Sequence, residues 1–150
     1  MRVLLLTLVM AFFSTITSAH DVRCAGKAIA APFDPITDAL YYLERVQKGE
    51  MWTPAGHPVP PKIRNLGPNS CEQVVCMKGA QVRWCNDDTK NSRSMPVENI
   101  RQGAAVLYNE CQQNYKGKRV AGGQLTHPDN WSVVVQGVDE CKFPEMPYKV

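Results

Sequence analysis

The chain has 150 residues, 44% of them apolar, with 17 Lys and Arg, 14 Asp and Glu and six cysteines. A chain of this length favours one domain with a single modest core. The net charge of +3 lacks the clustered basic surface by which proteins neutralise phosphates, so we expect no nucleic-acid partner.

The first nineteen residues predict a secretory signal peptide. Arg2 provides a positive charge before an apolar run over residues 3–13, and the small residues Thr17 to Ala19 form a cleavage site. Cleavage after Ala19 would remove Arg2 and leave residues 20–150, with a net charge of +2 and all six cysteines. No later apolar run approaches the roughly 20 residues of a membrane span, so we expect a secreted, extracellular protein without one.

Six cysteines in an exported chain predict up to three disulfides, each worth roughly 2 to 4 kcal/mol of stability. The spacing alone leaves the pairing open. The favoured arrangement pairs Cys85 with Cys111, which would join a strand to the second helix. Cys141 would pair with one member of the closely spaced pair Cys71 and Cys76, and Cys24 would join the N-terminal arm to the other member.

Helical periodicity is strongest in the first part of the chain. Residues 20–33 form an arm held down mainly by Cys24. A helix is expected over 35–47, with Asp34 as its N-cap and Gly49 as its stop. Its apolar residues recur at spacings of three and four: Ile36, Ala39, Leu40, Leu43 and Val46. Five prolines in the segment 49–69 then predict an irregular, extended surface segment.

The remaining elements alternate between strands and a helix. Residues 80–85 predict a strand, a second helix follows Pro96 and ends by Asn114, and strands over 120–126 and 131–138 flank a turn. This order predicts an α+β fold, in which a small antiparallel sheet is packed by two helices and stapled by disulfides. The chain divides into an N-terminal arm, helix and Pro-rich segment (20–69), a cysteine-rich α+β core (70–141) and a tail (142–150).

The cysteine-rich part resembles a pattern in small secreted fungal proteins. The resemblance rests on Cys71-x4-Cys76, the run from Gly79 to Asp87, Gly122-Gly123-Gln124, and alternation from Asp129 to Cys141. It covers roughly residues 70–141. Such proteins are similar to plant-interaction effectors or to small killer toxins, and the resemblance implies virulence or toxin-like activity without identifying a catalytic residue.

His20 is the sharpest single candidate for chemistry, because after cleavage it would offer both its α-amino group and its imidazole to one metal ion. With His57 or His127 as third donor, these nitrogens would hold copper as in the oxidative polysaccharide-cleaving enzymes. The Pro-rich surroundings of His57 and the turn around His127 argue against that arrangement. We therefore expect no metal and no cofactor, and a copper-dependent oxidase is an alternative function.

A small hydrolase is a second enzymatic alternative, since it needs only two positioned titratable groups. The candidates are His57, His127, Glu98, Glu110, Asp129, Asp87 and Asp88. The aspartates lie where turns favour them, and the glutamates belong to the solvated side of the second helix, so no spacing among them demands catalysis. A membrane-active killer-type toxin is a third alternative.

The leading expectation is a secreted effector that binds a host or competitor molecule outside the producing cell. We expect a binding protein rather than an enzyme. Its partner would be a protein or a cell-surface glycan, contacted by exposed loops on the disulfide-bonded scaffold. Trp84 and Trp131 alternate in phase with valines and are expected to pack on the sheet. The binding candidates are Trp52 in the Pro-rich segment and, in the hairpin turn, His127, Asp129 and Asn130.

Overall fold

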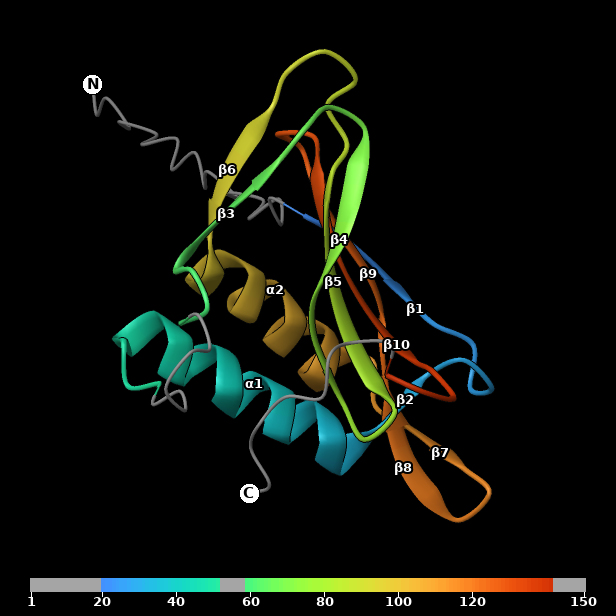
Figure 1. The fold of residues 1–150 in the computed structure, drawn as a ribbon. Coiled ribbons are helices and arrows are strands. Elements are labelled where there is room, and N and C mark those ends of the chain that lie inside the picture. The colour runs from blue at the N-terminus through green and yellow to red at the C-terminus, as the bar shows by residue number, and fades with distance from the viewer. Residues whose placement is uncertain (1–19, 52–58, 142–150) are drawn as a thin grey trace, which may run out of the picture.

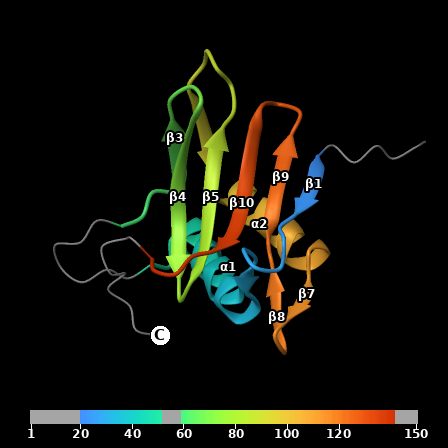
Figure 2. The ribbon, with the colours of Figure 1, turned by 90° about the vertical axis from the view of Figure 1, so that its right-hand side faces the viewer.

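A five-stranded antiparallel sheet is covered on one face by two helices in this computed structural model (Figures 1 and 2), which describes residues 20–51 and 59–141. The helices are α1 (Phe33–Lys48) and α2 (Val97–Glu110). In sheet order, the strands are β1 (Asp21–Cys24), β9 (Gly123–His127), β10 (Trp131–Gly137), β5 (Ala80–Asn86) and β4 (Ser70–Met77). The expected α+β fold with a sheet packed by two helices is confirmed.

Two smaller sheets flank this layer. One joins β2 (Ala31–Pro32), β8 (Lys118–Ala121) and β7 (Gln113–Tyr115), and the other pairs β3 (Ile63–Leu66) with β6 (Arg93–Pro96). The backbone N–H of Val97 donates to the carbonyl oxygen of Lys62 (2.9 Å), which attaches the start of α2 to the residue that precedes β3. Part of the Pro-rich segment expected to be irregular is therefore a strand.

The core lies between the helices and the sheet. α1 packs on β4 and β5, and α2 packs on β9 and β10. The periodic apolar residues of both helices and the alternating residues of the central strands are buried together: Ile36, Leu43, Val46, Ile100, Leu107, Val82, Trp84, Val133 and Val135. The expected packing of Trp84 is confirmed, since its side chain has no exposed surface.

The strand expected over 120–126 is two strands that belong to different sheets. The chain changes sheets at Gly122 and Gly123, whose φ angles are 146° and 156°. A Cβ on Gly123 would lie 2.2 Å from the carbonyl oxygen of Arg23, so the close approach of β1 requires glycine there. The sequence pattern indicates an unbroken strand because it carries no information on which neighbour each half pairs with.

The N-terminal arm is held by more than its cysteine. Residues 21–24 pair along their whole length with β9, which makes β1 an edge strand of the main sheet. The prediction of an arm fixed mainly by Cys24 is therefore wrong. Its partner strand lies about a hundred residues later in the chain, as Asp21 faces Thr126, and local periodicity does not report pairing at that distance.

Three disulfides join Cys24 to Cys111, Cys71 to Cys85 and Cys76 to Cys141. The expected return of Cys141 to the first close pair is confirmed. The Cys85–Cys111 bridge is wrong, because Cys85 faces Cys71 directly across β4 and β5 and Cys111 caps the end of α2 beside β1. Disulfides of this density in a small chain are typical of secreted or extracellular proteins.

Within residues 20–51 and 59–141, neither α1 nor α2 is long and apolar enough to cross a membrane.

Candidate functional site: a cleft at one end of the sheet

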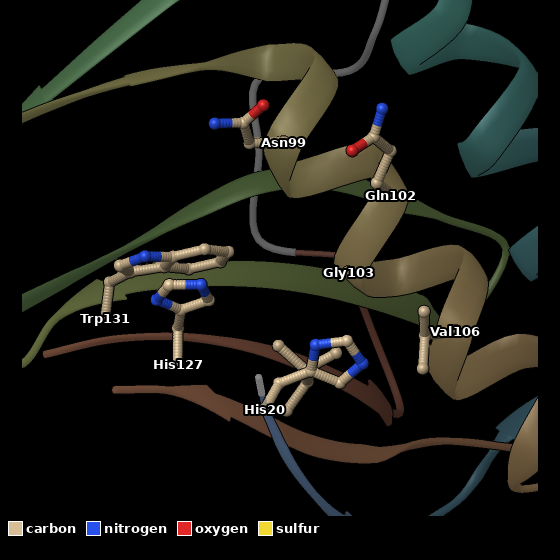
Figure 3. A pocket seen from close by; sticks show the side chains of 8 residues that line it. His20, Asn99, Gln102, Gly103, Val106, His127 and Trp131 are labelled. Atoms are coloured by element: carbon tan, nitrogen blue, oxygen red, sulfur yellow. The ribbon is translucent and has the colours of Figure 1, made fainter. Parts of the chain in front are cut away.

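A pocket of about 290 Å³ lies between the outer turns of α2 and the end of the sheet where β9 turns into β10 (Figure 3). The helix contributes Asn99, Gln102, Gly103 and Val106, the sheet contributes Leu125, His127 and Trp131, and His20 lies just before β1. We call this pocket the end cleft. It combines apolar walls with a few convergent polar groups, as small-molecule sites do.

His127 and Trp131 form the floor of the end cleft. They face each other across the β9–β10 hairpin, and their rings stack with centroids 4.7 Å apart and an interplanar angle of 15° (Figure 3). Trp131 is in phase with Val133 and Val135 on the helix-facing side of β10, as the alternation predicts. Unlike those two valines it is only half-buried, so its indole packs on the sheet and also lines the cleft.

The hairpin turn fixes the imidazole of His127. Its Nδ1 accepts a hydrogen bond from the backbone N–H of Asp129 (3.2 Å) and lies 3.3 Å from the Asp129 carboxylate. Asn130 has a φ of 60° and closes the turn by donating its N–H to the His127 carbonyl oxygen (3.1 Å). Asp129 and Asn130 therefore shape the turn, and of the three turn candidates only His127 lines the cleft.

The helix side of the cleft carries two amides. Gln102 donates to Glu98 Oε1 (2.9 Å), and the same carboxylate receives two hydrogen bonds from Arg101, which lower the pKa of Glu98. Asn99 donates to the sulfur of Met95 at 3.6 Å. In Figure 3 the terminal amides of both side chains point away from the His127–Trp131 pair, so they lie at the outer rim of the cleft.

Sequence reasoning missed the contribution of α2, although a signal was present. Asn99, Gln102, Gly103 and Val106 follow helical spacing and form one stripe, immediately beside the buried stripe that contains Ile100 and Leu107. The sequence analysis assigned only Glu98 and Glu110 to a solvated side of this helix and made no prediction for the stripe. Only the position of the β9–β10 hairpin shows that the stripe faces a cleft.

His20 and His127 line the same cleft, whereas the other candidates within the described residues do not. Trp52 and His57 lie outside the described residues. Asp88 is a turn residue, since its carboxylate accepts hydrogen bonds from the N–H groups of Lys90 and Asn91, which lower its pKa. Glu110 ends α2 on the exposed surface. Across residues 20–51 and 59–141, no three His, Cys, Asp or Glu side chains cluster as a metal site.

A second hollow, of about 560 Å³, lies near the C-terminal end of β10. Three glutamines on neighbouring strands form an amide ladder there, in which Gln136 donates to Gln81 (2.8 Å) and Gln81 donates to Gln73. Asp139 and Glu140 line the same hollow. The glutamine amides are hydrogen-bonded to one another, and the described residues that line this hollow include no aromatic side chain. This hollow therefore offers less to a ligand than the end cleft.

Comparison with protein-family models, curated proteins and solved structures returns no match to this chain.

Proposed function

We propose that this protein is exported and acts outside the producing cell by binding a molecule of a host or competitor, as do the fungal effectors that its cysteine pattern resembles. The observation that carries the proposal is the end cleft. An aromatic pair on the rigid sheet faces two side-chain amides on α2, inside a scaffold closed by three disulfides.

The chemistry of the cleft favours a glycan as the ligand. Sugar rings present apolar C–H faces that pack on indole, and hydroxyl groups that donate and accept at the same time. Trp131 supplies the aromatic surface, and Asn99 and Gln102 supply amides that can do both. A dry, strongly apolar groove would instead favour a hydrophobic peptide, and the end cleft has polar side chains along its helix wall.

Binding of the secreted protein to defined oligosaccharides tests this proposal. The probes are hexamers of chitin, β-1,3-glucan, xylan and mannan, measured by titration calorimetry. We expect one of them to bind, and Trp131→Ala to weaken that binding at least tenfold because stacking on the indole is lost. Asn99→Ala and Gln102→Ala should weaken it less, by about 1 kcal/mol each, as for single neutral hydrogen bonds.

Gln124→Ala is the matched control, because Gln124 is on the same strand as His127 but is exposed on the opposite face. Its binding should equal that of the unmodified chain. Failure of all four oligosaccharides to bind would contradict a glycan ligand, and capture of a host surface protein that depends on Trp131 would point to a protein partner instead.

A further inference from the structure

We propose that the mature protein binds one Cu(II) ion in the end cleft, through the α-amino and imidazole nitrogens of His20 and the imidazole of His127. This inference rests on the proposed export with cleavage after Ala19, but it does not depend on a glycan ligand. It reverses the expectation of no metal, which rested on the Pro-rich surroundings of His57 and the turn around His127.

Strand pairing brings the residue before β1 to the end of β9. β1 pairs with β9 so that Asp21 faces Thr126 and Val22 faces Leu125. His20 is a bend residue that directly precedes Asp21, and His127 directly follows Thr126. Because side chains alternate along strands, both histidines fall on the helix-facing side with Val22 and Leu125, and both line the end cleft (Figure 3).

Both imidazoles line the same cleft of about 290 Å³, so rotation about their side-chain torsions can bring them toward a single ion. In Figure 3 the ring of His127 lies beneath the indole of Trp131, and the ring of His20 lies on the Val106 side of the cleft. Rotation of the more peripheral ring, that of His20, would close the site.

The terminal position of His20 supplies the missing donor. Two imidazoles alone make a weak site, and the described part of the chain holds no third His, Cys, Asp or Glu arranged to complete it. Removal of the leader would create an α-amino group on His20, which can chelate one ion together with the imidazole of the same residue. Three nitrogen donors of this kind suit the tetragonal geometry of Cu(II), which also binds nitrogen sites more tightly than other divalent first-row metals.

Asp129 prepares His127 for this role. In the structure Nδ1 accepts the hydrogen bond from the Asp129 N–H, so a neutral imidazole carries its proton on Nε2. Binding of an ion at Nε2 would therefore move that proton to Nδ1, where the Asp129 carboxylate, 3.3 Å away, can accept its hydrogen bond. Histidine ligands commonly donate their other N–H to a carboxylate in this way. The stacked indole of Trp131 holds the plane of the same ring. Contacts with Asp129 and Trp131 therefore fix the orientation of the His127 ring. A surface histidine without a binding role needs no such fixed orientation.

The test is titration of copper sulfate at pH 7.5 into protein purified from culture medium, whose N-terminus is read by sequencing. Calorimetry gives the affinity, and electron paramagnetic resonance counts the coordinated nitrogens. The reference is the tetrapeptide His-Asp-Val-Arg, which has the sequence of residues 20–23 and offers the terminal chelate without His127. We expect a stoichiometry of one and an affinity at least tenfold tighter than that of the peptide.

Variants locate the site. His127→Ala should reduce the affinity to that of the peptide, and Asp129→Asn should reduce it by about tenfold, the smaller effect of losing an orienting partner. Acetylation of the α-amine should abolish tight binding without a substitution that could disturb folding. His57→Ala is the matched control, because it removes the remaining histidine and should leave the affinity unchanged.

Three outcomes would overturn the proposal: a mature N-terminus other than His20, an affinity no tighter than that of the peptide, or full affinity in folded His127→Ala. Copper binding with no oligosaccharide binding would support this site and refute only the glycan ligand. The reverse result would refute the copper site and leave the glycan ligand standing.

Discussion

Gly103 shows how single residues set the distance between α2 and the sheet. Glycine inside a helix costs roughly 1 kcal/mol relative to alanine, so its presence needs a reason. An added Cβ would lie 3.0 Å from Cγ2 and 3.3 Å from Cβ of Val133, which is fully buried in β10. The glycine therefore lets the helix approach the strand closely beside the end cleft.

Gly103→Ala should destabilise the protein by about 1 kcal/mol, because overpacking at a buried contact outweighs the gain in helix propensity. Urea unfolding measures the change. In a Val133→Ala background the same substitution should become neutral or stabilising, since the clashing methyl groups are gone. A more stable Gly103→Ala single variant would contradict the close contact.

Glu72 is a partly buried carboxyl group whose pKa is raised by burial. Its side chain is 28% exposed, its nearest cation is Arg64 at 3.9 Å, and burial raises its pKa while Arg64 lowers it in part. Because the folded-state pKa lies above the unfolded value, the folded state holds the proton more tightly. Stability contributed by this group therefore decreases as the pH rises through the region above the ordinary pKa of a glutamate.

Glu72→Gln should consequently become more stable relative to the unmodified chain as the pH rises from about 4 to 7. Glu98→Gln is the control of opposite sign, because hydrogen bonds from Arg101 lower the pKa of Glu98 and stabilise its charged form. That variant should lose stability at pH 7 and approach the unmodified chain at low pH. Urea unfolding at the two pH values decides, and parallel behaviour of the two variants would refute the assignment.

At the scale of elements, the sequence predicts the helices and strands whose apolar pattern lies within the element itself. Both helices follow from apolar spacing, and β5 follows from alternation that ends at Asn86. β4 does not, because a register shift between Gln73 and Val75 buries Val74, Val75 and Cys76 in succession and removes the two-residue period. β1 and the helix wall of the cleft depend on partners distant in the chain, which no local pattern reports.

The disulfides provide a prediction about how elements are held together. Cys24–Cys111 spans 87 residues and ties the edge strand β1 to the end of α2, whereas Cys71–Cys85 spans 14 residues between paired strands. Loop-closure entropy assigns them about 4.6 and about 3 kcal/mol, respectively. Replacing both members of each pair with serine should therefore lower the thermal midpoint more for Cys24/Cys111, as measured by calorimetry.

Loss of the Cys24–Cys111 bridge should also loosen β1 and with it the end cleft, because within the described part of the chain β9 is the one strand that pairs with β1. Amide hydrogen exchange on residues 21–24 should rise selectively in that variant. The Cys71/Cys85 variant is the control, since its bridge lies in the β4–β5 pair. Equal exchange of β1 in both variants would contradict a stapling role for Cys24.

At the scale of the whole molecule, the arrangement turns the beginning of the described chain into part of a site. The edge strand brings His20 to the β9–β10 turn, and α2 closes the space above them. The sequence analysis named both histidines and the turn but left open whether they meet, because local periodicity does not report that residues 21–24 form a strand. The antiparallel pairing of β1 with β9 brings together residues about a hundred positions apart at one cleft.

The central claim is that the protein is exported and that its mature form begins at His20 beside this cleft. Mass spectrometry and N-terminal sequencing of the protein recovered from culture medium test it most directly. We predict a chain that begins His-Asp-Val-Arg and contains no free thiols. A secreted chain that begins elsewhere, or protein that stays inside the cell with residues 1–19 attached and reduced cysteines, would contradict the account.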